Sequence, residues 1–101
     1  MNTFVFNNST NFIYTIKDME GGVFMLDAKV VGHTIRQFRE KKKLSQELVS
    51  GFADIGRTHL SAIERGERKP TLETFFKICD ALQVKPSVLM AQIEEELRKQ
   101  R

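Results

Sequence analysis

The 101-residue chain has little or none of several features that mark other classes of protein. A single cysteine, Cys79, allows no disulfide within the chain and no cluster of thiolates around zinc. No apolar run approaches the roughly 18 residues that a membrane-spanning helix needs. The N-terminus has no basic segment followed by an apolar stretch, as a secretory signal would have. These absences lead us to expect a small cytoplasmic protein.

Patterns that accompany catalysis are also missing. His33 and His59 have no cysteine or carboxylate cluster at metal-ligand spacing, so we expect no metal site. The chain has no glycine-rich phosphate loop and no serine-centred nucleophile motif. Cys79 falls on the apolar face of a predicted helix, where a small core residue is expected rather than a nucleophile. We therefore expect no enzymatic activity and no cofactor.

Positive charge is concentrated in the middle of the chain. The whole sequence has a formal charge of +3, and residues 1–27 contribute a net −2. Residues 36–69 hold nine cations against five anions, which gives +4. A basic middle suits a polyanionic partner such as a nucleic acid, although a solvated basic surface is the plainer interpretation.

Residues 1–26 differ in character from the rest and are treated as an N-terminal extension. They are rich in Asn, Phe and Thr and lack helical spacing, so we expect either a β-hairpin of 12–17 with 23–26 or no regular structure. A second hypothesis is that Met25 is the native start. The codons for Glu20-Gly21-Gly22 can resemble a ribosome-binding site just upstream of it.

From residue 27 to residue 101 apolar residues recur at helical spacing. Ser45, Gly56 and Thr71 each precede such a segment as a capping residue, and Pro86 fits the first turn of the last one. Five short helices joined by short loops indicate an all-α bundle. The expected helices span about 28–42, 45–53, 57–65, 71–82 and 86–101.

The second and third of these helices, joined by a tight turn, form a helix-turn-helix arrangement. Ser50 supplies the small side chain that close crossing requires, and Asp54 must adopt a left-handed backbone in the turn. Leu48 and Phe52 lie one turn apart where polar residues are expected. Either the N-terminal extension or a partner covers them, or they are partly exposed at the edge of the core.

Between positions 32 and 89 a set of residues is specific in its order and spacing. Its members are Gly32, Ile35, Arg36, Phe38, Arg39, Leu44-Ser45-Gln46, Ile55, Arg57, Leu60-Ser61, Ile63-Glu64-Arg65-Gly66, Pro70, Leu72-Glu73-Thr74, Lys77-Ile78, Ala81-Leu82 and Val84. Through these residues the segment resembles the lambda-repressor/Cro (XRE-type) helix-turn-helix family. Within it the segment is most similar to the controller proteins of restriction–modification systems and to small phage or plasmid repressors. The chain departs from the family pattern at Asp54, Gly56, Gln83 and Lys85, which replace preferred capping residues.

The resemblance implies a five-helix lambda-repressor-like fold whose third helix enters the major groove of DNA. Arg57 is the strongest candidate for specificity, while His59 and Arg65 have solvated surface positions as their alternative. The expected base-contacting residues are Arg57, Thr58, His59, Ser61 and Ala62. The expected phosphate-contacting residues are Lys43, Ser45, Gln46, Arg65, Arg68 and Lys69.

Two further roles follow from the resemblance. Arg39 and Glu64 are expected to form a structural ion pair rather than to contact DNA. The last helix is expected to form the interface of a homodimer through Met90, Ile93 and Leu97, the latter two lying beyond the core.

The expected function is that of a sequence-specific transcriptional regulator that binds double-stranded DNA as a homodimer on a palindromic operator. The expected source is a bacterium, a phage or a plasmid. The alternative is an antitoxin or coactivator-like module of the same fold whose main partner is another protein.

Overall fold

Side-chain caps stand at the start of three helices, at Asp27, Ser45 and Thr71. The computed structural model describes residues 4–6, 12–15 and 26–100. The Ser45 hydroxyl oxygen accepts a hydrogen bond from the Leu48 backbone N–H at 3.0 Å. The Thr71 hydroxyl oxygen accepts one from the Thr74 N–H at 3.1 Å. Each cap satisfies a backbone donor that has no partner within the helix, so the chain enters the helix at that residue.

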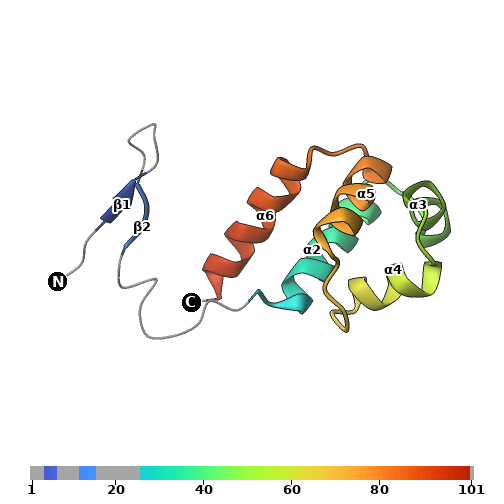
Figure 1. Ribbon diagram of the computed structural model, residues 1–101, viewed down its shortest axis with the longest axis horizontal. Helices are drawn as coiled ribbons and strands as arrows, with labels where there is room; N and C mark the ends of the chain where they lie inside the picture. The colour runs from blue at the N-terminus through green and yellow to red at the C-terminus, as the bar shows by residue number, and fades with distance from the viewer. Residues whose placement is uncertain (1–3, 7–11, 16–25, 101) are drawn as a thin grey trace.

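Five helices follow one another along residues 28–99, as the spacing of apolar residues predicts (Figure 1). The all-α, five-helix expectation is therefore confirmed for this part of the chain. The helices are α2 (Ala28–Lys41), α3 (Gln46–Ala53), α4 (Arg57–Glu64), α5 (Leu72–Leu82) and α6 (Pro86–Lys99). None of the helices among the described residues combines the length and apolar character needed to cross a bilayer.

Two short strands precede the helices, β1 (Phe4–Phe6) and β2 (Phe12–Thr15), and they pair antiparallel. The expected strand from residue 12 is thus present, and the structure pairs it with β1. Residues 23–25 of the expected partner, residues 23–26, lie outside the described residues. The hypothesis that Met25 is the native start also concerns residues outside the described ranges and stays a hypothesis.

Helix α2 lies at the centre of the bundle and packs against α4 on one side and α6 on the other (Figure 1). Helix α3 packs against α4 and α5, and α5 packs against α6. Burying one large apolar side chain stabilises the fold by roughly 1.5–3 kcal/mol. All five helices contribute fully buried side chains to one core: Ile35, Val49, Leu60, Ile63, Ile78, Leu82 and Leu89.

Ile93 belongs to this core, with only 2% of its surface exposed. The expectation that Ile93 lies beyond the core, free for a dimer interface, is therefore wrong. Leu89 and Ile93 are four residues apart, so they share one face of α6, and that face is turned inward. Leu97, one turn further, is half-buried and packs against the same core.

Close approach of α2 and α4 depends on Gly32. A Cβ atom at this position would lie 2.0 Å from the backbone oxygen of Ile63 and 2.9 Å from that of Glu64. Only glycine leaves room for the α4 backbone at this distance. The first and third helices therefore pack against each other directly through their main chains.

The turn between α3 and α4 completes the helix-turn-helix. Asp54 ends α3 with a left-handed backbone (φ +56°), and the Ile55 N–H donates to the backbone oxygen of Ser50 at 3.0 Å. Ser50 itself is buried. Gln83 adopts the same backbone at the end of α5 (φ +55°). A left-handed backbone costs a residue with a Cβ roughly 1–2 kcal/mol, so both positions are strained relative to glycine.

Candidate nucleic-acid interface

A stripe of polar side chains, which we call the reading stripe, runs along one face of α4 and ends at its C-cap residue: Arg57, Thr58, Ser61 and Arg65. At 3.6 residues per turn these four positions fall within an arc of about 100°. Arg57, Thr58 and Arg65 are exposed, and Ser61 is half-buried. The opposite side of α4 holds Leu60 and Ile63, which are fully buried. The core therefore fixes which way the stripe faces.

Ala62 does not belong to this stripe. It is 8% exposed, so the expectation that Ala62 faces outward toward bases is wrong. Its position falls on the flank of α4, where the following loop folds back and the Glu67 N–H donates to the Ala62 oxygen at 2.9 Å. His59 lies further round the helix and is half-buried, so its contact with DNA stays a prediction.

Arg39 on α2 and Glu64 on α4 form a buried ion pair. Arg39 Nε donates to Glu64 Oε2 at 2.7 Å, and Arg39 Nη2 donates to Oε1 at 2.9 Å. The side chains are 11% and 2% exposed. Arg39 Nη1 also donates to the Leu44 backbone oxygen at 2.7 Å. The hydrogen bond to the Glu64 carboxylate raises the pKa of Arg39 above its ordinary value. Arg39 is thus placed for structure and is turned away from solvent.

Gln46, at the start of α3, joins the same pair. Its Nε2 donates to Glu64 Oε1 at 3.0 Å. A carboxamide has two N–H donors, so one remains for a second partner. Gln46 follows Ser45, the cap of α3, and free backbone N–H groups at a helix start suit a phosphate. The network therefore orients a candidate phosphate contact as well as the reading helix.

Arg65 is paired with Glu67. Arg65 Nε donates to Glu67 Oε2 at 2.7 Å and Nη2 donates to Oε1 at 3.1 Å. Arg65 Nη1 also donates to the Ser61 hydroxyl oxygen. The Arg65 guanidinium holds the pKa of the Glu67 carboxyl below its ordinary value, and the carboxylate raises the pKa of Arg65. Arg65 is therefore engaged already, which the prediction of a phosphate contact at this position did not foresee.

Glu67 was missed by sequence reasoning, although a signal for it exists. Arg65 and Glu67 are two residues apart, and such residues do not face each other in a helix. Gly66 between them has a left-handed backbone (φ +79°), which ends α4 and turns the chain so that the two side chains meet. An opposite charge on each side of a C-terminal glycine is the pattern to look for.

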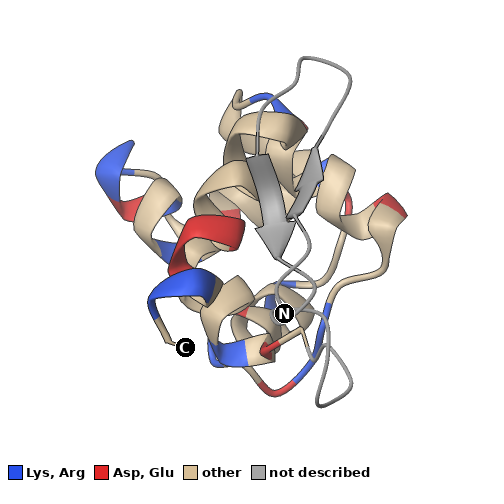
Figure 2. Cartoon of the chain, turned by 90° about the vertical axis from the view of Figure 1, so that its left-hand side faces the viewer, with Lys and Arg blue, Asp and Glu red and all other residues tan. Residues whose placement is uncertain are grey.

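Further cations border the helix-turn-helix. Lys43, Arg68 and Lys69 are exposed in the loops before α3 and after α4. On α6, by contrast, an acidic stretch is followed by a basic one toward the C-terminus (Figure 2). The excess of positive charge thus lies beside the helix-turn-helix, in residues 36–45 and 65–69.

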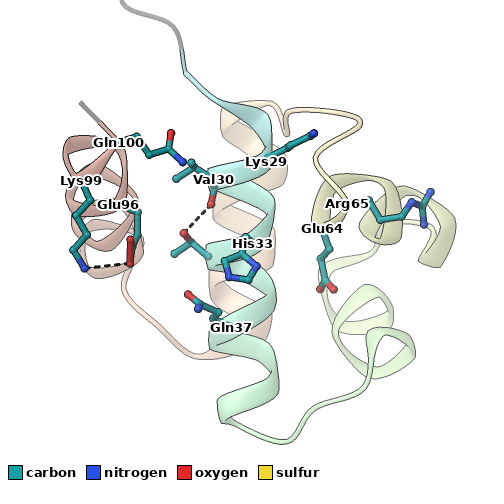
Figure 3. A pocket seen from close by; sticks show the side chains of 10 residues that line it. Lys29, Val30, His33, Gln37, Glu64, Arg65, Glu96, Lys99 and Gln100 are labelled. Atoms are coloured by element: carbon teal, nitrogen blue, oxygen red, sulfur yellow. Dashed lines mark hydrogen bonds and ion pairs between the residues drawn. The ribbon is translucent and has the colours of Figure 1, made fainter.

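A pocket of about 490 Å³ lies over α2, between the C-terminal ends of α4 and α6 (Figure 3). Cations such as Lys29 and Lys99 alternate around it with the carboxylates Glu64 and Glu96. His33 lines it on the exposed face of α2, but the described residues contain no group of three His, Cys, Asp or Glu side chains able to hold a metal. This mixture of charges favours no particular ligand.

Comparison with known proteins relates this geometry to a family. Residues 35–89 match the family model described as helix-turn-helix. The chain is 42% identical over 60 residues to control protein C.BamHI of Bacillus amyloliquefaciens, covering 58% of this chain and 74% of that protein. It is 38% identical over 74 residues to control protein C.MunI of a Mycoplasma species, covering 71% of this chain and all of that protein. The crystal structure of the restriction–modification controller protein C.AhdI from Aeromonas hydrophila superposes with a TM-score of 0.61 at 31% identity, covering 64% of this chain and 98% of that one.

Proposed function

Because the chain belongs to the helix-turn-helix family and is a DNA-binding transcriptional regulator rather than an enzyme, we propose that it acts as a homodimer on a two-fold symmetric operator. The single observation that carries this proposal is the reading stripe on α4, held outward by the core beneath it and by the Arg39–Glu64 pair at the end of the helix. Such a helix fits the major groove with its first residues at the base edges.

Arg57 is the proposed centre of base recognition. It stands at the first position of α4 and is exposed, and its planar fork can donate to guanine O6 and N7 together. Such a pairing is worth about 1–3 kcal/mol of discrimination against another base. Thr58 adds a hydroxyl and a methyl group, the latter suited to the methyl of thymine. His59 and Ser61 complete the proposed base contacts.

Phosphates are the proposed partners of the residues around this helix. Ser45 and Gln46 stand at the start of α3, where backbone N–H groups and the helix dipole favour an anion. Lys43, Arg68 and Lys69 add exposed positive charge in the adjoining loops. Each phosphate neutralised contributes about 0.9 to the slope of log affinity against log salt, so binding is expected to weaken steeply as salt rises.

One module covers too little DNA for high specificity, and a symmetric dimer reads two half-sites. The proposed dimer surface uses α5 and α6, which pack together and expose apolar side chains. Met90 on α6 is 43% exposed, and Leu72 and Phe76 on α5 are 67% and 52% exposed. Half-buried Leu97 extends this surface, while Ile93 supports it from within the core.

A controller of a restriction–modification system is the proposed biological role. The named relatives C.BamHI and C.MunI are control proteins, and the chain spans most or all of their length. The matched segment covers all of C.MunI and 74% of C.BamHI, and control through the concentration of the protein is the proposed mode of regulation.

A module whose main partner is a protein is the second candidate. It is favoured by Leu48 and Phe52 on α3, which are 44% and 72% exposed beside a pocket of about 290 Å³. A DNA reader should shift random duplex at low salt, because its basic surface binds phosphates without regard to sequence. A pure protein adaptor should leave random duplex unshifted.

Selection of bound duplexes from a random pool tests the main proposal. We expect enrichment of one sequence with two-fold symmetry, with half-sites about one helical turn apart, since each protomer presents one α4. Enrichment of an asymmetric single site would contradict the homodimer. Failure to enrich any sequence would overturn the regulator itself.

A further inference from the structure

Glu67 is the only carboxylate among the described residues that forms an ion pair with the reading stripe. Its two oxygens meet two nitrogens of Arg65 at 2.7 and 3.1 Å, in a bidentate arrangement. The third nitrogen of the same guanidinium donates to Ser61 Oγ. Glu67 is therefore linked through Arg65 to Ser61. Both Arg65 and Ser61 belong to the stripe that faces DNA in the proposed function.

We propose that Glu67 is a specificity-determining positioning residue that acts through Arg65. By holding the guanidinium against Ser61, it withdraws Arg65 from the phosphates of any DNA sequence and fixes the role of the Ser61 hydroxyl. This inference rests on the proposed function. It adds Glu67, which is not among the residues that carry the family resemblance, to those that decide specificity.

The first consequence concerns Arg65. A guanidinium that contacts phosphate strengthens binding to every sequence, because phosphates are the same throughout a duplex. Paired with Glu67, Arg65 brings no net charge to the interface. Glu67 therefore lowers non-specific affinity and leaves contacts of Arg57 and Thr58 to decide which sequence is bound.

The second consequence concerns Ser61. Its hydroxyl oxygen accepts from Arg65, which occupies one of its two lone pairs and leaves its own O–H free to donate. A hydroxyl that accepts a charged hydrogen bond is also polarised into a better donor. Ser61 is thereby favoured as a donor to base acceptors such as guanine O6 and N7 or thymine O4.

The test compares Glu67→Gln with Glu73→Gln, a matched control in which the exposed carboxylate pairs with Lys77 within α5 and not with a residue of the stripe. Fluorescence anisotropy measures affinity for the operator selected by the unchanged protein and for a scrambled duplex of the same composition. Release of Arg65 adds one phosphate contact. For Glu67→Gln we therefore expect about five- to tenfold tighter binding of the scrambled duplex and a salt slope steeper by about 0.9. Glu73→Gln should match the unchanged protein.

The double variant Arg65→Gln/Glu67→Gln separates positioning from simple loss of negative charge. If Glu67 acts through Arg65, its removal changes nothing once Arg65 is replaced. An equal gain of scrambled-duplex affinity in both backgrounds would overturn the proposal, as would a Glu67→Gln variant that behaves like Glu73→Gln. If the unchanged protein does not distinguish operator from scrambled duplex, the proposed function itself fails, which is a different and recognisable result.

Discussion

Gln46 and Arg39 donate to the same oxygen of one carboxylate, Oε1 of Glu64. Because these residues come from α3, α2 and α4, a single buried side chain joins three helices. The described residues contain no buried side-chain nitrogen or oxygen without a hydrogen-bond partner, so this network is fully satisfied. A satisfied buried network rigidifies its surroundings, and here it fixes the end of the reading helix against the helix that presents phosphate contacts.

Glu64→Ala should therefore lower stability and weaken DNA binding together. Removing one partner leaves the Arg39 charge buried without compensation, which typically costs about 3–5 kcal/mol. Thermal unfolding followed by circular dichroism measures the first effect, and operator affinity below the Tm measures the second. Glu73→Ala, in an exposed pair, is the control and should change stability by about 1 kcal/mol or less. Weaker DNA binding at unchanged Tm would contradict the structural role.

Much of this architecture is predictable from the sequence, because helix ends depend on local chemistry. Ser45 and Thr71 cap helices that begin at the next residue, and Pro86 occupies the first turn of the last helix. What local chemistry cannot give is the rotation of a helix about its axis. Neighbouring residues differ by about 100° in direction, so an error of one position moves a side chain from solvent into the core. Ala62 was misplaced for this reason. Ile93 was misplaced because the spacing of apolar residues does not show how far along α6 the core extends.

The network around Glu67 was beyond sequence reasoning for another reason. Its geometry depends on the left-handed backbone of Gly66, which lies next to Lys29 of α2. The charges on each side of Gly66 are visible in the sequence, but the contact between the start of α2 and the end of α4 follows from tertiary packing. The Arg39–Glu64 pair also joins residues far apart in the chain, and it was predictable only because a family resemblance implied it.

Gly32→Ala should destabilise the domain more than the small size of the added methyl group suggests. The added methyl would lie 2.0 Å from the Ile63 backbone oxygen, so α2 and α4 must move apart. Overpacking of this kind typically costs about 1–3 kcal/mol, and here the clash is with backbone that cannot rotate away. Gly51→Ala is the matched control, because nothing lies within 4 Å of the added Cβ. It should stabilise α3 by about 0.5–1 kcal/mol. Equal Tm values for the two variants would contradict the close approach.

Gln83→Gly should raise the Tm. Gln83 ends α5 at φ +55°, where glycine escapes the strain of a Cβ. Part of the gain is lost because glycine also increases the entropy of the unfolded chain, so a net stabilisation of about 0.5–1 kcal/mol is expected. Asp80→Gly, three residues earlier inside α5, provides the control and should destabilise by a similar amount. Chemical denaturation at neutral pH measures the free energy of unfolding of both variants. Destabilisation by Gln83→Gly would count against strain in the left-handed backbone at this position.

Cys79 should be unreactive in the folded protein and should make stability fall at alkaline pH. It is fully buried, and desolvation raises its pKa to about 11. The neutral thiol is favoured in the folded state, so its contribution is complete below the thiol pKa of the unfolded chain. That contribution is lost as pH rises toward 11, by up to about 2–3 kcal/mol. Cys79→Ala lacks this titration, so its stability should fall less steeply over the same range. Rapid labelling of native protein by a thiol reagent at pH 8 would disprove the burial.

Met90→Asp should convert the proposed dimer to a folded monomer. Met90 is 43% exposed, so a charge there is solvated in the monomer but costly in an apolar interface. Ile93→Asp cannot serve this purpose, because Ile93 is buried in the core and its replacement would unfold the protein. Val88→Asp is the matched control: it is 49% exposed on the opposite flank of α6 and should leave the dimer intact. Sedimentation equilibrium gives the molecular mass, and circular dichroism shows that each variant is folded. If Met90→Asp remains dimeric while Val88→Asp is monomeric, the interface lies on the other flank of α6. Two half-sites need two reading helices, so a monomeric variant should also lose affinity for the symmetric operator. The same variant should still shift a single half-site at low salt.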